Sequence, residues 1–179
     1  MGRRRRGRGR VVTISRLIVS GALAGAALVA LAACSPQDRT SAASAAPQAQ
    51  PARHPESGLE VIPLTVTQNG KVHRFTVEVA KSEEEQAKGL MFRKQMGADE
   101  GMIFPRRPPD VPSFWMRNTV IPLDIIFIGT DGKILNIAAN AVPYSLESLP
   151  SAGVASAVLE LNGGRAAQLG IGPGAKVEW

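Results

Sequence analysis

The chain has 179 residues, of which 44% are hydrophobic, and a formal net charge of +6. Seven arginines and no acidic residue precede Cys34, so the remainder carries 14 basic and 15 acidic residues and a net charge of −1. A nucleic-acid partner would require a basic face on the folded part. This charge balance does not offer one, and the sequence therefore predicts no nucleic-acid partner.

Residues 1–33 have the layout of a secretory signal peptide. Arginines from Arg3 to Arg16 form a positive segment, and an apolar run rich in Ala and Gly follows from Leu17 to Leu31. The run is shorter and less apolar than the roughly 20 residues that a stable membrane span needs. We predict that residues 1–33 are removed, the alternative being an uncleaved membrane helix with a chance cysteine.

The sequence Leu31-Ala32-Ala33-Cys34 resembles the bacterial lipobox, in which a peptidase cuts before a diacylated cysteine. Two or three acyl chains, such as palmitate, would anchor the protein firmly. Cys34 is the only cysteine, so lipidation leaves no thiol for a disulfide or a metal. We therefore expect a lipoprotein outside the cytoplasm. Because Ser35 and not Asp follows, it would lie on the periplasmic side of the outer membrane in an organism with two membranes.

Residues 34–58 are predicted to be a flexible tether. They are rich in Ala, Ser, Pro and Gln and contain no large apolar side chain, so they cannot bury enough surface to offset the entropy of ordering. His54 is expected to be solvated there. Residues 59–179 are long enough to form a single globular domain with its own core.

The sequence of residues 59–179 predicts many short strands and two short helices. Asn69-Gly70 between two alternating runs indicates a hairpin, and Ser82 with Glu85 forms a capping-box pattern for a helix that ends near Gly89. Strands are expected at 61–67, 72–79, 101–104, 113–116, 123–128, 133–138, 154–161 and 177–179, with a proline-rich loop at 106–112 and a helical turn at 165–169. This spacing favours a mainly β (α+β) domain, a small sandwich or a partly closed barrel.

Several phrases in this order resemble the domain-of-unknown-function 192 family. They are GLMFR at 89–93, GMIF at 101–104, FWMRNT at 114–119, IPLDIIFI at 121–128, DGKI at 131–134, VLELNGG at 158–164 and GIGPG at 170–174. The resemblance spans residues 59–179 and implies a small β-sandwich or jelly-roll-like fold in which lipoprotein forms are common. Arg117 stands where Lys is frequent, which changes donor geometry but not charge. No reaction is implied, because the family's molecular function is not established.

The densest polar segment runs from Phe114 to Asp124. The candidate ligand-binding residues are Trp115, Arg117, Asn118 and Asp124, with Arg93 and Glu160 added from other segments. Strand alternation would separate Asn118 from Trp115 and Arg117, so the set converges only if a loop or bulge intervenes. Otherwise these side chains only pack the core and complete a turn.

Asp124 and Glu160 each stand within an apolar strand, where a buried carboxylate must be paired. Arg93, Arg117 or Asn118 is the expected partner of Asp124. Two carboxylates with an arginine could also hydrolyse a glycosidic bond. The four methionines at 91, 96, 102 and 116 are too dispersed for a copper(I) site and are expected in the core. We predict no metal and no cofactor.

The Gly163-Gly164-Arg165 segment has two interpretations. Its backbone N–H groups could cradle an anion, or the glycines could only form a turn before a short helix.

We therefore expect an exported, lipid-anchored domain that binds an envelope component without catalysis. The ligand would be a glycan, a peptidoglycan fragment or an envelope protein, with Trp115 and Tyr144 supplying stacking. One alternative is an extracytoplasmic hydrolase that uses Asp124 and Glu160 with arginine stabilisation. Another is an assembly factor that has no pocket and exposes a broad apolar patch.

Overall fold

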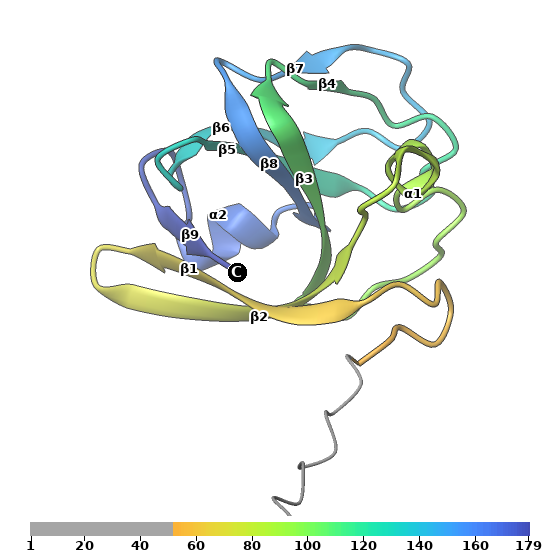
Figure 1. Ribbon diagram of the computed structural model, residues 1–179, viewed down its shortest axis with the longest axis horizontal. Coiled ribbons are helices and arrows are strands. Elements are labelled where there is room, and N and C mark those ends of the chain that lie inside the picture. The colour runs from red at the N-terminus through yellow and green to blue at the C-terminus, as the bar shows by residue number, and fades with distance from the viewer. Residues whose placement is uncertain (1–51) are drawn as a thin grey trace, which may run out of the picture. The chain divides into compact units, whose positions relative to one another are not determined.

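The structure is a computed structural model that describes residues 52–179 (Figure 1). The predicted signal peptide, Cys34 and most of the predicted tether lie outside the described residues. Within residues 52–179, no helix has the length and apolar character needed to cross a membrane.

A seven-stranded sheet with strand order β6-β5-β8-β3-β2-β1-β9 forms the body of the domain. All neighbouring strands are antiparallel except β2 and β3, which are parallel and are connected through α1 (Glu83–Lys88). The strands are β1 (Val61–Gln68), β2 (Lys71–Val79), β3 (Glu100–Asp110), β5 (Leu123–Gly129), β6 (Ile134–Ala141), β8 (Ala155–Asn162) and β9 (Lys176–Glu178). A second sheet pairs β4 (Ser113–Phe114) with β7 (Leu149–Pro150).

The large sheet curls until its two ends meet. The segment that leads into β9 bonds to the turn between β5 and β6, through Gly174 N to Ile134 O, Ile134 N to Ala175 O and Val177 N to Gly132 O. Figure 1 shows β9 beside this turn, with α2 (Arg165–Leu169) inside the curl. The prediction of a mainly β fold with two short helices is confirmed, and the sheet is partly closed.

Strand β5 lies between β6 and β8, one strand in from the edge of the sheet, and separates two cores. All seven of its residues are buried. Ile126 and Ile128 pack with residues of β1, β2, β9 and α2, whereas Ile125 and Phe127 pack on the other face against the segments that follow α1 and β4. Burial of each such side chain stabilises the fold by about 1.5–3 kcal/mol. Burial on both faces therefore explains why the run at 123–128 is apolar apart from Asp124.

Local sequence signals around β1, β2 and α1 are realised as predicted. Asn69 and Gly70 have φ of 50° and 77°, as a two-residue hairpin turn requires. Ser82 Oγ accepts a hydrogen bond from Glu85 N at 3.1 Å, and Glu85 Oε2 accepts one from Ser82 N at 2.8 Å, which completes the capping box.

Several predicted boundaries are wrong; β6, for example, ends at Ala141 and not at Ala138. β3 does not end at Pro105 but continues to Asp110, with a register shift in its pairing to β8 between those residues, so the predicted loop at 106–112 is mostly strand. Prolines lack the N–H that a regular ladder needs, which explains the irregular register. The strand that begins at Ser113 ends at Phe114, and Trp115 onward forms a loop.

The end of the predicted tether is in contact with the domain. Val61 N donates to Ala52 O, and Arg53 pairs with Glu60 in an isolated bridge. His54 was expected to be solvated, yet only 20% of its side chain is exposed, and its Nδ1 accepts a hydrogen bond from Glu56 N. These backbone contacts bring the chain onto the domain before Leu59.

Candidate functional site

Three loops meet at one end of the domain and are joined by backbone hydrogen bonds. Phe92 N, in the loop after α1, donates to Asn118 O at 2.9 Å. Met116 N donates to Ser145 O at 2.9 Å, and Tyr144 N donates to Thr119 O at 3.2 Å. The loops after α1, after β4 and after β6 therefore form one continuous structure.

These loops expose large apolar side chains. Phe92 is 64% exposed, Tyr144 61% and Leu146 68%, and Val142 and Trp115 are also exposed. We call the set formed by Phe92, Trp115, Arg117, Val142, Tyr144 and Leu146 the aromatic loop surface. Single exposed apolar residues are ordinary, but several on joined loops indicate an interaction site.

The backbone beneath two of these aromatic residues is strained. Phe92 and Tyr144 both have φ of 63°, in the left-handed region that bulky residues rarely adopt. Such conformations cost on the order of 1–3 kcal/mol each and persist only where the surrounding structure enforces them, often at functional sites. Here the hydrogen bonds of Phe92 N and Tyr144 N hold the backbone in place.

The loop after β4 brings Trp115 and Arg117 together. The guanidinium carbon of Arg117 lies 5.5 Å from the centroid of the Trp115 ring, at cation–π distance. Asn118 has φ of 55° and its Nδ2 lies 3.8 Å from the Met91 sulfur. Trp115, Arg117 and Asn118 thus lie in one loop, which was the condition for these side chains to form a common site. The Asn118 amide, however, contacts the Met91 sulfur.

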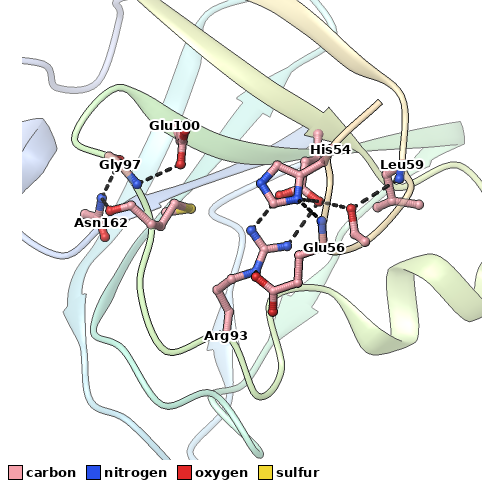
Figure 2. Close-up of polar contacts among 10 residues, drawn as sticks. His54, Glu56, Leu59, Arg93, Gly97, Glu100 and Asn162 are labelled. Atoms are coloured by element: carbon pink, nitrogen blue, oxygen red, sulfur yellow. Dashed lines mark hydrogen bonds and ion pairs between the residues drawn. The ribbon is translucent and has the colours of Figure 1, made fainter. Parts of the chain in front are cut away.

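Arg93 lies in a different environment. Its side chain is buried and makes a bidentate pair with Glu78, at 2.8 Å from Nη1 to Oε1 and 3.1 Å from Nη2 to Oε2. Arg93 Nε also lies 3.4 Å from a carboxylate oxygen of Glu56, and Ser57 Oγ donates to Glu78. Figure 2 shows Arg93 between His54 and Glu56. This cluster fastens residues 54–57 to β2 and to the loop after α1.

The sequence did not identify Glu78 as a partner. Alternation with Val77 and Val79 places it on the solvent face of its strand, yet it is only 3% exposed because the 54–57 segment covers it. That segment looks unstructured by composition, so no local pattern signals the burial.

Asp124 is fully buried, and its partners are backbone amides. Its Oδ1 accepts hydrogen bonds from Asn140 N and Gly164 N, both at 2.9 Å, and its Oδ2 accepts one from Ala166 N at 2.8 Å. The predicted pairing with Arg93, Arg117 or Asn118 is therefore wrong. Of the two interpretations of Gly163-Gly164-Arg165, the turn before a short helix fits, because the N–H groups of Gly164 and Ala166 already bind the Asp124 carboxylate.

Glu160 is buried on the opposite face of the sheet from Asp124. Its register partners are Met102 on β3 and Ile125 on β5, whereas Asp124 pairs with Leu161. Burial raises the pKa of the Glu160 carboxyl to about 8. Because the two carboxylates point to opposite faces, they do not form a catalytic pair across one bond.

The surface of the described part of the chain includes the following two hollows. A cleft of about 720 Å³ runs between β1, β2, α1 and the end of β3, and Trp179 borders it. A shallow hollow lined by Glu56, Phe92, Lys94 and Gln95 adjoins the aromatic loop surface.

Among residues 52–179, no group of three or more His, Asp, Glu or Cys side chains is arranged to hold a metal.

The sequence model of the family described as DUF192, "Uncharacterized ACR", matches residues 64–179. The chain therefore belongs to the DUF192 family, as the resemblance indicated. No curated protein matches it.

Two solved structures are similar to this chain. One is the crystal structure of a protein of unknown function from Novosphingobium aromaticivorans DSM 12444. The two sequences are 62% identical and the TM-score is 0.71. The match covers 74% of this chain and 94% of the other. The other is described as a candidate transcription regulator from Sinorhizobium meliloti 1021, and is 39% identical with a TM-score of 0.65. That match covers 67% of this chain and 94% of the other.

Replacing Asp124 by Asn should destabilise the domain by about 1–3 kcal/mol, because one of the three backbone N–H groups loses its acceptor inside the core. Urea unfolding measures the change. Asp131→Asn is the matched control, since Asp131 is exposed and an asparagine oxygen still accepts from Lys133 N. Equal stability of the two variants would contradict the structural role assigned to Asp124.

Glu160 should make the stability depend on pH. Its folded-state pKa lies above its unfolded value, so the folded protein binds more protons and is most favoured at low pH. Relative to Glu160→Gln, the wild-type free energy of unfolding should fall by about 1.4 kcal/mol per pH unit from about pH 5 to the folded pKa, then level off. Urea unfolding at several pH values measures this. Parallel pH profiles of the two proteins would show that Glu160 does not titrate in this way.

Proposed function

We propose that the protein is an exported lipoprotein whose domain binds an envelope component without catalysis, through the aromatic loop surface. Phe92 and Tyr144 carry the proposal: both are more than half exposed and both are held at φ of 63°. Asparagine would be less strained at either position. Keeping a large aromatic side chain exposed at a cost in stability is explained by contact with a partner.

The polar candidates divide between binding and structure. Arg117 beside Trp115 lies in the proposed contact surface. Arg93 supports it indirectly, because its pair with Glu78 fixes the backbone next to Phe92. Asp124 acts through the scaffold, since it holds Asn140 just before the loop that carries Val142 and Tyr144.

Other functions have less support. A hydrolase that uses Asp124 and Glu160 is disfavoured because the two side chains face opposite sides of the sheet. The regulator description of the Sinorhizobium relative would imply nucleic acid, but the chain after Cys34 has a net charge of −1. An assembly factor that docks on other proteins would use the same exposed surface. Identification of a crosslinked protein partner would support this alternative.

Site-specific photo-crosslinking in the native envelope tests the binding surface. A photoreactive phenylalanine analogue at Tyr144 should give adducts with an envelope component, and adding Trp115→Ala should reduce them. The matched control places the analogue at Val72, which is 47% exposed but lies on β2 outside the loops. Equal adducts from both positions would count against a dedicated surface.

The anchor is tested at Cys34. Cys34→Ser should prevent lipidation and processing, so the protein should retain residues 1–33 and lose the mass of the acyl chains. Mass spectrometry of the purified protein measures both changes, with Ser35→Ala as a control that keeps the thiol. If the mature Cys34→Ser protein and the mature wild-type protein differ in mass only by the exchange of sulfur for oxygen, Cys34 carries no lipid.

A further inference from the structure

The composition of the aromatic loop surface differs from that of a sugar-binding site. Such sites combine stacking rings with free polar groups in a hollow. Here the Asn118 amide is turned to Met91 and Arg117 lies over Trp115, while Val142 and Leu146 add exposed aliphatic groups. Tryptophan and tyrosine mixed with aliphatic side chains are typical of segments at a membrane–water interface.

The chain leaves the domain beside this surface. Glu56 and Phe92 line the same hollow, and Arg93, next to Phe92, lies 3.4 Å from Glu56. In Figure 1 the 52–58 turn, the loop after α1 and the connection from β4 to β5 lie at the same, right-hand end of the domain. The N-terminal attachment point and the exposed aromatic residues therefore share one end of the molecule.

The distance to the anchor is short. Residues 35–51 separate Cys34 from the first described residue, and a chain of this length spans at most about 60 Å when fully extended. If residues 35–51 form the flexible tether that the sequence predicts, their root-mean-square length is about 20–25 Å. With Cys34 in a bilayer, the domain stays within about 60 Å of that bilayer, and the end that carries Phe92 is tied to it.

Charge contributes little to this contact. Lys94 and Arg117 are exposed cations near the surface, and Glu56 and Glu147 are exposed acids near it. The apolar side chains, and not a basic patch, must therefore supply the attraction, in contrast to proteins that bind anionic lipid through lysine and arginine clusters.

We propose that the aromatic loop surface inserts into the interfacial region of the membrane that holds Cys34. This inference rests on the proposed function, both for the lipid anchor and for the role of the surface, and it names the lipid surface as the bound component. Trp115, Phe92 and Tyr144 enter the headgroup layer, and Val142 and Leu146 reach the acyl boundary. The acyl chains and the loop surface then form two contacts that orient the domain on the bilayer.

Tryptophan fluorescence of the mature, lipidated protein in vesicles tests the proposal. The chain has two tryptophans, so Trp179→Phe leaves Trp115 as the only emitter. Its emission should shift to shorter wavelength and be quenched when the vesicles contain brominated acyl chains. Trp115→Phe is the matched control: Trp179 borders the separate cleft between β1 and β3, and its emission should not be quenched.

A second variant removes the apolar groups without straining the fold. Phe92→Asn with Tyr144→Asn, in the Trp179→Phe background, places at both positions a residue that tolerates left-handed φ. Quenching of Trp115 should fall, while the thermal midpoint should stay the same or rise. Unchanged quenching would overturn the proposal, and a lowered midpoint would overturn the account of these two residues as strained contacts.

The lipid composition separates insertion from simple attraction. Quenching should occur in vesicles of neutral lipid and persist at high salt. Quenching that requires anionic lipid and disappears with salt would overturn insertion.

The failure of this proposal can be distinguished from the failure of the proposed function. If Trp115 is not quenched in any vesicle, but its emission changes with peptidoglycan fragments, the membrane proposal fails and the proposed binding function stands. If neither lipid nor glycan affects Trp115, and Tyr144 gives no crosslinks, both fail.

Discussion

The contact between Asp124 and three backbone amides fixes the geometry on which the loops depend. Asp124 stands at the start of β5, just after the loop that carries Trp115 and Arg117. Through Asn140 it holds the end of β6, from which the loop with Val142 and Tyr144 departs, and through Gly164 and Ala166 it holds the turn into α2. One buried carboxylate therefore sets the relative positions of two of the three loops, with every N–H it meets satisfied.

The third loop is positioned by the Arg93–Glu78 pair. This pair connects the segment after α1 to the middle of the sheet, and the 54–57 segment encloses it. Removing one partner of such a buried pair leaves an uncompensated charge, which is far more costly than the pair is worth as a contact. Together with Asp124, it makes the end of the domain rigid while the side chains at its tips remain in solvent.

Much of the fold could be predicted because its signals are local. The Asn69-Gly70 turn, the Ser82 capping box and the apolar run of β5 each depend on neighbours in sequence, and each is present. The end of β3 is not local in this sense, because its prolines favour an early end and only pairing with the distant β8 shows that the strand continues. The burial of Glu78 is equally non-local, since its cover comes from residues that precede β1.

The candidate site was predicted only in part. Trp115 and Arg117 do meet, but in a loop and not in the predicted strand, which ends at Phe114. Arg93, Asp124 and Glu160 were grouped with them on residue type, but the sheet sends the two acids to opposite faces and buries Arg93 against Glu78. The left-handed backbone of Phe92 and Tyr144 has no sequence signal, since glycine and asparagine usually mark that conformation.

The pairing of β9 with β1 has a consequence for the proposed export of the chain. β1 lies between β2 and β9, so the outer edge of the first hairpin is covered by residues 176–178. A polypeptide that crosses a membrane from its N-terminus delivers β1 and β2 long before β9. Until the last residues arrive, that edge is open to pairing with other strands. For a chain exported as proposed, the sheet would therefore close only after translocation is complete, and the topology itself would delay folding to the far side of the membrane.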